Sequence, residues 1–163
     1  MLKKEIRTLG LSSRPIGRSK VLFVGIVFRG SLWLDGVFSC TLELGRHGFV
    51  RQLARAIKTC SQYQQLHALI FLEDRLPFDS NLTVARFSRE IKLPIIVIGG
   101  NADSEKSGNC LVPVGGRSVA VKLFGIDCSL ARAIYAVTCA HNRRIPEATR
   151  VAEMLSKSKS MKP

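Results

Sequence analysis

"VLFVGIVFRGSLWLDGVFSCTLEL" (residues 21–44) joins a continuous apolar run to a run of alternating polarity. The apolar run predicts a buried strand, which Arg29-Gly30 ends. The alternating run predicts a second strand over residues 32–44. Its apolar face is expected to hold Leu34, Phe38, Cys40, Leu42 and Leu44, and its polar face Trp33, Asp35, Ser39, Thr41 and Glu43. Because only "RGS" (29–31) separates the strands, they should form an antiparallel hairpin.

The segments around this hairpin predict further strands and helices. Upstream, "IRTLGLSS" (6–13) reads as a short strand and "SSRPIGRS" (12–19) as a turn-rich loop. Downstream, Val50, Leu53, Ala54 and Ile57 follow the i, i+3, i+4, i+7 rule and predict an amphipathic helix over about 47–61. The next predicted elements are a buried strand (66–72), a helix capped at 79–81 that runs through Ile91, and another buried strand (93–100).

The last third of the chain predicts a second hairpin and two helices. Gly115-Gly116 in "VPVGGRSVAV" (112–121) marks the hairpin turn, and a strand follows over 118–126. The helices are expected over about 127–142 and from Pro146, which suits the first turn of a helix.

Up to residue 100 the order is therefore three strands, a helix, a strand, a helix and a strand. Three sequential strands can pair as an antiparallel meander, and the later βαβ units must add parallel strands through right-handed crossovers. This predicts an α/β fold with a mixed sheet flanked by helices, in the order of the ribonuclease H-like core. We expect a single domain over residues 1–155 and a basic tail over 156–163. Fold analogy alone does not establish function.

Composition restricts where such a chain works. Its 163 residues, of which 46% are hydrophobic, are enough for one domain with a real core. The longest apolar runs are too short to cross a bilayer, and no signal-peptide core follows the basic N-terminus, so we expect a cytoplasmic protein without a membrane partner. The five cysteines form no CxxC pair, which predicts reduced thiols.

The charge balance favours a polyanionic partner. With 25 Lys and Arg against 12 Asp and Glu, the net charge is +13, and nucleic acid is the first candidate. A stripe at helical spacing in the 47–61 helix carries no acid and consists of His47, Arg51, Arg55, Lys58 and Gln62. Either it contacts phosphates, together with Arg46 near the helix start, or it is an ordinary solvated face.

The acidic residues gather in "FLEDRLPFD" (71–79), where a buried strand should emerge. Carboxylates at a strand end are where a nuclease would hold a divalent metal. The three histidines are scattered without ligand spacing, which argues against a zinc site.

Four segments carry a resemblance to a known family: "KKEIRTLGLSSRP" (3–15), "VLFVGIVFRGSLWLDGVFS" (21–39), "LPIIVI" (93–98) and "RRIPEATRVAEML" (143–155). The chain resembles the archaeal endonuclease dU family, which is itself similar to endonuclease V. The most specific parts are Arg29-Gly30 with residues 33–36, and residues 145–147 with 150–152. Arg29 and Arg150 of these blocks are candidate nucleic-acid contacts.

The resemblance implies a ribonuclease H-like fold and metal-dependent cleavage of DNA near a deaminated base such as deoxyuridine. Such chemistry needs carboxylates that converge on Mg²⁺ or Mn²⁺. Where relatives end the first strand with two aspartates, this chain has Ser12-Ser13, and where they carry Asp after the third strand it has residues 45–48, "GRHG". Of the three expected acidic positions only Glu73 remains, with Asp74 beside it.

Two residues of the hairpin allow alternatives. Asp35 is either a replacement metal ligand or a structural partner of Arg29, and we favour the pairing. Trp33 either stacks on an unpaired base or lies in the core under a helix, and we favour the core.

Three functions remain open. In the first, the chain binds nucleic acid, DNA rather than RNA, with a degraded metal site. Alternatively, it is a divergent endonuclease that uses Glu73, Asp74 and Asp35 as catalytic candidates, with Mg²⁺ or Mn²⁺ held weakly by Glu73. The third is a non-catalytic subunit whose basic face meets an acidic protein. In every case we expect Ser12, Gly45 and Glu73 to lie close together.

Overall fold

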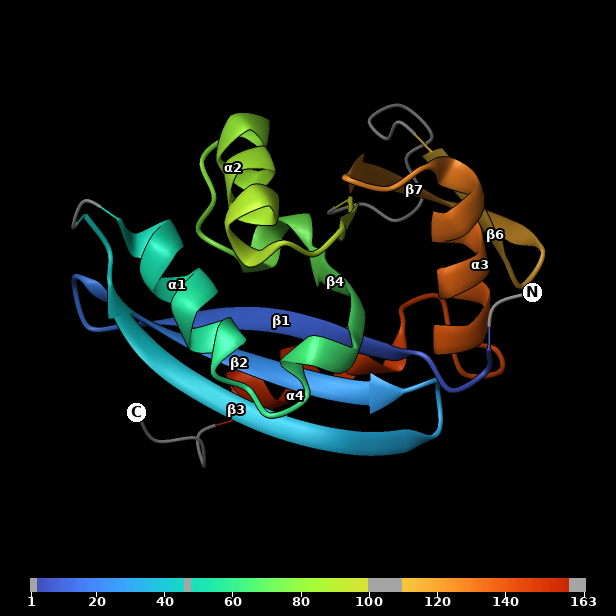
Figure 1. The fold of residues 1–163 in the computed structure, drawn as a ribbon, viewed down its shortest axis with the longest axis horizontal. Helices are drawn as coiled ribbons and strands as arrows, with labels where there is room; N and C mark the ends of the chain where they lie inside the picture. Colours follow the sequence, from blue (N-terminus) through green and yellow to red (C-terminus); the bar gives the residue numbers. More distant parts are fainter. Residues whose placement is uncertain (1–2, 46–47, 100–109, 159–163) are drawn as a thin grey trace.

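The computed structural model describes residues 3–45, 48–99 and 110–158. Within them, seven strands form a single sheet in the order β3-β2-β1-β4-β5-β7-β6 (Figure 1). The strands are β1 (Arg7–Ile16), β2 (Lys20–Arg29), β3 (Trp33–Glu43), β4 (Leu66–Leu72), β5 (Ile95–Ile98), β6 (Cys110–Val114) and β7 (Arg117–Phe124). The helices are α1 (Phe49–Lys58), α2 (Asn81–Ile91), α3 (Cys128–Thr138) and α4 (Glu147–Lys157), and short 3-10 turns are η1 (Tyr63–Gln65) and η2 (Glu73–Arg75).

The pairing pattern confirms the predicted mixed sheet. β1, β2 and β3 form an antiparallel meander, and β4 and β5 extend it in parallel from β1. β7 then pairs antiparallel with β5, and the β6–β7 hairpin turns at Gly115-Gly116 as predicted. This arrangement brings the carboxyl ends of β1 and β4 to the same edge of the sheet.

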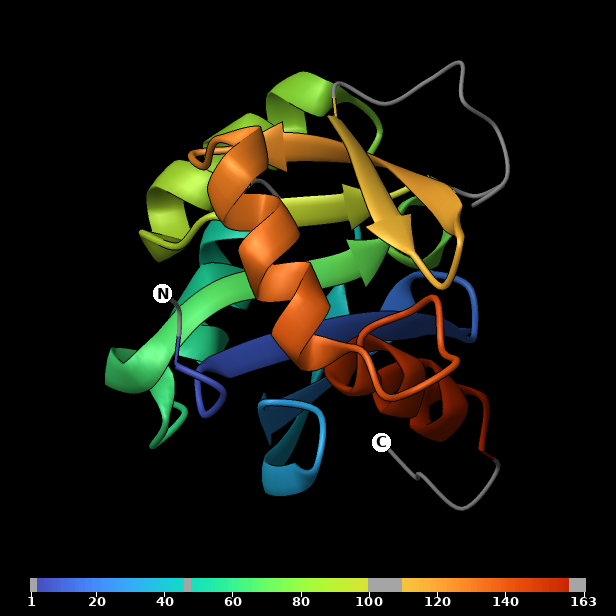
Figure 2. The same cartoon turned by 90° about the vertical axis from the view of Figure 1, so that its right-hand side faces the viewer.

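Helices cover both faces of the sheet. On one face α1 and α2 bury the predicted apolar stripe of α1, including Leu53 and Ile57, against Leu9 and Leu11 of β1. On the other face α3 packs across β4 and β5 through Ile134 (Figure 2). The remaining members of the buried stripes are Val50 and Ala54 on α1, and Ala131 and Tyr135 on α3.

α4 lies directly on β1 and β2, where Ala148 and Ala152 contact the buried side chains of β2. The approach is closest at Gly10, where a Cβ atom would lie 2.1 Å from the backbone carbon of Ala148. Glycine at this position therefore lets the helix rest on the strand. α4 is thereby held against β1 at Gly10, and the Ser12–Ser156 contact continues this packing two residues further along the strand.

The loop predicted for residues 12–19 is wrong in its first part. β1 continues through Ile16, and only residues 17–19 turn. The reason is that β2 pairs with β1 over the whole length, whereas β4 pairs with it only from Arg7 to Gly10. Pro15 is tolerated because this part of β1 has a single neighbouring strand.

The face assignment of β3 is correct except at its start. The register shifts beside Asp35, so that Leu34 lies opposite Phe28 and Gly36 opposite Val27. Because this bulge inserts one residue, Leu34 points to the opposite face from that predicted and is 56% exposed. Phe38, Cys40, Leu42 and Leu44 pack against the core as predicted.

The prediction that Trp33 lies in the core is also wrong, since its side chain is 62% exposed. α1 packs against β3 only from Phe38 onward. The indole at the start of the strand is therefore left at the surface.

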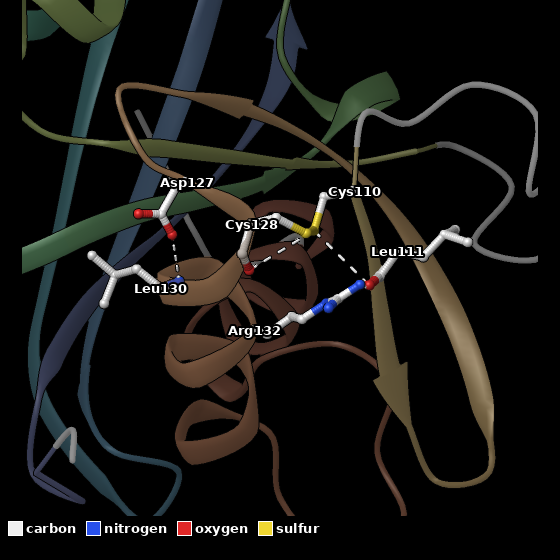
Figure 3. The surroundings of a disulfide bond; sticks show 6 residues. All are labelled: Cys110, Leu111, Asp127, Cys128, Leu130 and Arg132. Atoms are coloured by element: carbon white, nitrogen blue, oxygen red, sulfur yellow. Dashed lines mark hydrogen bonds between the residues drawn. A yellow bond between two sulfur atoms is a disulfide. The ribbon is translucent and has the colours of Figure 1, made fainter.

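The prediction of reduced thiols fails at one pair. Cys110, at the start of β6, and Cys128, the first residue of α3, form a disulfide with a Cα–Cα distance of 5.7 Å (Figure 3). The hairpin returns the chain to its starting point, which unites two cysteines 18 positions apart. Beside the disulfide, the Asp127 carboxylate accepts the Leu130 amide and caps α3. Cys40, Cys60 and Cys139 are free thiols.

The described helices include none that is long and apolar enough to span a membrane.

Candidate functional site

The ends of β1 and β4 form one edge of a candidate site. The parallel register pairs Gly10 with Ile70, which places Ser12 and Ser13 level with the end of β4. The η2 turn follows β4 at once, and the Ser13 hydroxyl donates a hydrogen bond to the carbonyl oxygen of Arg75 at 2.6 Å. Ser12 and Glu73 therefore share this edge, as expected.

Gly45 follows β3 at the same end of the sheet. Its neighbour Leu44 donates a backbone hydrogen bond to Ser19 in the β1–β2 turn, at 2.7 Å. The β3–α1 connection then borders a cavity of about 390 Å³ together with Asp79 and Arg86. Through Val24 of β2, Ser12 is level with Ser39 of β3, six positions before Gly45. The structure therefore brings Ser12 and Glu73 to one edge but does not bring Gly45 beside Ser12.

α4 supplies two residues to this edge that sequence reasoning missed. The hydroxyls of Ser12 and Ser156 lie 3.0 Å apart, and both residues are buried. Ser156 also donates to the Glu153 carbonyl oxygen at 2.9 Å, so Ser12 serves as the donor to Ser156. Where the resemblance places an aspartate, the serine is thus satisfied within the protein.

Glu73, Asp74 and Glu153 at this edge each have a cation beside them, whereas the Asp79 carboxylate accepts the Thr83 hydroxyl. Glu153, whose side chain is 17% exposed, accepts from Arg75 at 2.9 Å and from Lys157 at 2.8 Å. Glu73 is ion-paired with Lys122 of β7, and the second carboxylate of the turn, Asp74, lies 3.8 Å from Arg75. Three acids, Glu73, Asp74 and Glu153, face three cations, Arg75, Lys122 and Lys157.

These residues do not fit a catalytic divalent metal. The described parts of the chain contain no group of three or more His, Cys, Asp or Glu side chains placed to hold an ion. A cation approaching Glu73 or Glu153 would have to displace an ammonium or guanidinium group that already neutralises the carboxylate. Mg²⁺ prefers about six oxygen ligands, and this edge has no comparable set of free ones.

Signals for the missed residues were present but incomplete. Arg75 stands inside the acidic segment "FLEDRLPFD", and Glu153 is one of only 12 acidic residues, in the block that carries the family resemblance. Lys122 lies in an alternating strand and has no such signal. Its pairing with Glu73 depends on the antiparallel addition of β7 beside β5.

Asp35 is not brought to this edge. It lies in the bulge of β3 opposite Val27 and Phe28 of β2, whereas Ser12 lies opposite Val24. There its carboxylate is ion-paired with Arg7, and Arg29 lies 3.7 Å from it. The pairing with Arg29 that we favoured is therefore observed, together with Arg7.

The predicted basic stripe is exposed along α1. Arg51, Arg55 and Lys58 all point to solvent, and the helix has no acidic residue. Gln62 turns inward instead, and its amide donates to the Asp35 carbonyl oxygen at 2.9 Å. Arg46 and His47, which we expected near the helix start, lie outside the described residues.

Arg150 does not join this stripe. Its guanidinium donates to both oxygens of the buried Glu147 carboxylate, at 2.7 to 3.1 Å, which raises the pKa of Arg150. The pair lies in the first turn of α4, on the other side of the sheet from α1. Its contacts stabilise that turn.

A second cavity, of about 260 Å³, opens beside Glu73. Phe71, Phe78, Val84 and Val97 give it an apolar floor, and Asp79 lies at its rim. The Thr83 hydroxyl donates to the Asp79 carboxylate at 2.5 Å and lowers its pKa. The cavity therefore combines an apolar interior with hydrogen-bonding groups at its mouth, as ligand sites do.

No family model matches the chain. Over 100 residues it is 34% identical to a UPF0215 protein of Methanosarcina acetivorans, and over 102 residues 30% identical to a UPF0215 protein of Methanothermobacter thermautotrophicus. Each alignment covers 60% of this chain and 50% or 49% of the relative. The chain spans about half the length of the curated relatives it matches.

Solved structures match nearly the whole chain. A protein of unknown function from Archaeoglobus fulgidus superposes with a TM-score of 0.68 at 15% identity, covering 93% of this chain and 96% of that one. Human ENDOV gives 0.63 at 12% identity, with 94% and 83% covered. Ciona intestinalis endonuclease V, solved with an inosine-containing DNA, gives 0.61 at 10%, with 93% and 84% covered. At these identities the likeness concerns the fold alone.

The resemblance to an archaeal family similar to endonuclease V is thus confirmed. The chain has homologues among the archaeal UPF0215 proteins, and its fold is the ribonuclease H-like α/β fold of endonuclease V.

Proposed function

We propose that this chain binds nucleic acid without metal-dependent cleavage. The observation that carries the proposal is the paired state of the strand-end carboxylates, Glu73 with Lys122 and Glu153 with Arg75. In a nuclease of this fold such carboxylates would be free to hold metal. Here the side-chain cations Lys122 and Arg75 neutralise these carboxylates, as a bound metal ion would in a nuclease.

Loss of cleavage follows from the number of free ligands. A two-metal mechanism holds ions about 3.5–4 Å apart, which requires several carboxylates shared between them. At this edge Ser12 is buried and hydrogen-bonded to Ser156, and Glu153 is engaged by two cations. An ion pair of this kind must be broken before either oxygen can coordinate a metal.

Binding is supported by the remaining charge. α1 exposes Arg51, Arg55 and Lys58 in a row without a counter-charge on the helix, and the chain as a whole carries +13. Such a face suits contacts to the phosphate backbone, which position a protein without reading sequence. We propose DNA as the main partner, with the α1 face as the contact surface.

The cavity beside Glu73 is the candidate site for a displaced base. Its apolar floor suits the flat face of a base, and Glu73, Asp79 and Asn81 offer hydrogen-bonding groups at the rim. A deaminated base pairs less well and is therefore easier to extrude. We propose a role related to the repair of deaminated bases on this ground.

Binding and cleavage should be measured side by side on labelled oligonucleotides that contain deoxyuridine, inosine or no lesion. We expect the same affinity in Mg²⁺, in Mn²⁺ and in EDTA, and no product on a denaturing gel. Robust cleavage that Glu73→Gln abolishes would contradict the proposal and establish the divergent endonuclease. Absence of binding at low salt would favour the protein-interaction subunit instead.

A further inference from the structure

The far end of the sheet carries an exposed aromatic side chain beside a cavity. Trp33 is 62% exposed and its neighbour Leu32 is 79% exposed. Both border a cavity of about 360 Å³, within the range usual for ligand sites. Single exposed apolar residues are common on protein surfaces, but exposed apolar residues that cluster at a cavity indicate a binding surface.

The cavity is built from three separate segments. Trp33 and Arg29 belong to the β2–β3 hairpin, Lys4 to the segment before β1, and Ala136 and Val137 to α3. Trp33 lies opposite Arg29 in the antiparallel register, so the two side chains emerge as direct neighbours on one face. The site therefore combines a flat aromatic surface with two cations, Lys4 and Arg29, and one acidic residue, Glu5.

The hairpin turn is held firmly in place. The Gly30 amide donates to the Ile6 carbonyl oxygen at 2.8 Å. Gly30 has a φ of 59°, and a Cβ there would lie 2.4 Å from the Lys4 carbonyl oxygen, so only glycine fits this approach. Trp33 is thus presented from an anchored turn rather than from a free loop.

The charge at this end is positive. Arg7 and Arg29 share the single carboxylate of Asp35, which leaves one guanidinium charge uncompensated. Arg29 approaches Asp35 only to 3.7 Å, and its Nε atom is buried and has no hydrogen-bond partner among the described residues. Because the Arg29 side chain is 35% exposed, its positive charge can be reached by a bound anion.

We propose that Trp33 and Arg29, with Lys4, form a stacking site for an unpaired base of single-stranded nucleic acid, with its phosphate held by the cations. This rests on the proposed function and extends it to a second place on the molecule. The site adjoins the α1 face, because Gln62, just beyond the helix, donates to the Asp35 carbonyl oxygen. Along β2 this site lies at Arg29, whereas Ser12 of the strand-end site lies opposite Val24, so the two sites are distinct.

The choice of a base follows from the combination of groups. A base offers a flat π-face for the indole and a phosphate for Arg29 and Lys4, and stacking on an aromatic side chain tolerates any base. A duplex keeps its bases stacked on one another and cannot offer that face. The site should therefore distinguish single strands from duplexes but not one sequence from another.

Trp33 is the only tryptophan in the chain, so its fluorescence reports on this site alone. We expect saturable quenching when the full chain is titrated with an oligodeoxythymidylate of about eight nucleotides, and much less with a blunt duplex of equal length. Followed by anisotropy of a labelled oligonucleotide, Trp33→Ala should weaken single-strand binding about 5- to 150-fold. Trp33→Phe, which keeps a ring, should lose less.

Leu82→Ala is a matched control, because Leu82 is 82% exposed on α2 and far from the cavity in sequence and fold. It should leave affinity unchanged. If the oligonucleotide binds by anisotropy while Trp33 fluorescence stays constant, the stacking site is refuted and the proposed function stands. If neither signal changes, both fail.

Two other outcomes would also overturn the site. Equal quenching by the blunt duplex would exclude an unpaired base as the ligand. A fluorescence shift that depends on protein concentration alone, with a dimer in sedimentation, would assign the Trp33 surface to contact between two copies of the chain.

Discussion

Arg75 is the residue on which the charge balance of the strand-end site depends most. Its guanidinium pairs with Glu153 at 2.9 Å and lies 3.8 Å from Asp74, while its backbone oxygen accepts from Ser13. One side chain therefore joins η2, α4 and the end of β1. A mutation that removes its charge but keeps a polar side chain should separate the structural role from the electrostatic one.

We expect Arg75→Gln to lower the free energy of unfolding by about 1–2 kcal/mol, since the pair is partly buried. Asp74, and Glu153 with Lys157 as its one remaining cation, should then gain measurable affinity for Mn²⁺. Calorimetry and thermal unfolding with Mn²⁺ and with EDTA would report both effects. Arg89→Gln, an exposed change on α2, is the control and should alter neither. Tight Mn²⁺ binding by the unchanged protein would contradict the view that Arg75 replaces a metal.

The raised pKa values of Cys139 and Tyr135 predict that the folded protein loses stability at high pH. Burial, and secondarily the charge of Glu147, raises the pKa of Cys139 to about 12. Burial also raises the pKa of Tyr135, whose hydroxyl donates to the Arg144 carbonyl oxygen at 2.6 Å. Above about pH 9 the unfolded chain loses these protons while the folded chain keeps them, so folding becomes less favourable as pH rises.

Denaturant unfolding between about pH 8 and 11 should therefore show a falling free energy, with a shallower fall in Cys139→Ala. At pH 8 the Cys139 thiol should react with iodoacetamide far more slowly in the folded protein than in urea. An equal rate in both states would show that the thiol is not buried.

Among the elements, the β6–β7 hairpin and α3 depend on a covalent link. The Cys110–Cys128 disulfide ties the first residue of β6 to the first residue of α3. The Arg132 side chain adds a hydrogen bond to the Leu111 carbonyl oxygen at 2.9 Å (Figure 3). The outer end of the sheet is therefore held by its helix rather than by further strands.

Reduction of this disulfide should lower the free energy of unfolding by about 3 kcal/mol, the chain-entropy value for a loop of 18 residues. Urea unfolding with and without dithiothreitol would measure it, and Cys110→Ser with Cys128→Ser should reproduce the reduced protein. Cys60→Ser retains the link and should still respond to dithiothreitol. Identical curves for oxidised and reduced protein would mean that the link does not constrain the unfolded chain.

Over the whole molecule, charge is distributed unevenly. The strand-end site is neutral by its three acids and three cations, so the net charge of +13 resides elsewhere. Part of this positive charge lies on α1. Another part lies at the end of the sheet that carries Trp33, where Arg7 and Arg29 are located. This arrangement favours binding along a strand over binding at one point.

Nucleic-acid affinity should accordingly fall steeply as salt rises. Arg51→Glu with Arg55→Glu should weaken binding equally for all sequences and flatten the slope of log K against log salt by about one unit per lost contact. Arg117→Glu makes the same change of charge at an exposed position on β7 and should have little effect. Unchanged affinity in the α1 variant would make its basic face an ordinary solvated surface.

Local patterns were sufficient for most elements of this protein. Continuous apolar runs predicted β2 and β4, and the period-3.6 pattern predicted α1. Cap residues predicted α2, which Ser80 caps as the sequence indicated. These features depend on neighbours within one turn or one hairpin, where a few residues determine the hydrogen-bonding pattern and the buried face. The β1–β3 meander and the parallel addition of β4 and β5 followed as well, because the connections up to residue 100 leave few topologies, but the antiparallel addition of β7 beside β5 did not.

Such local patterns did not predict contacts between segments that are distant in the sequence. The bulge at Asp35, which exposes Leu34, results from pairing with β2, and the Cys110–Cys128 link results from closure of a hairpin onto α3. The pairs Lys122 with Glu73 and Arg75 with Glu153 join residues 49 and 78 positions apart, and neither partner has a local signal for the other. Whether a carboxylate is free for a metal or neutralised by a side chain depends on which segments the completed sheet brings together, and sequence distance carries no information about that.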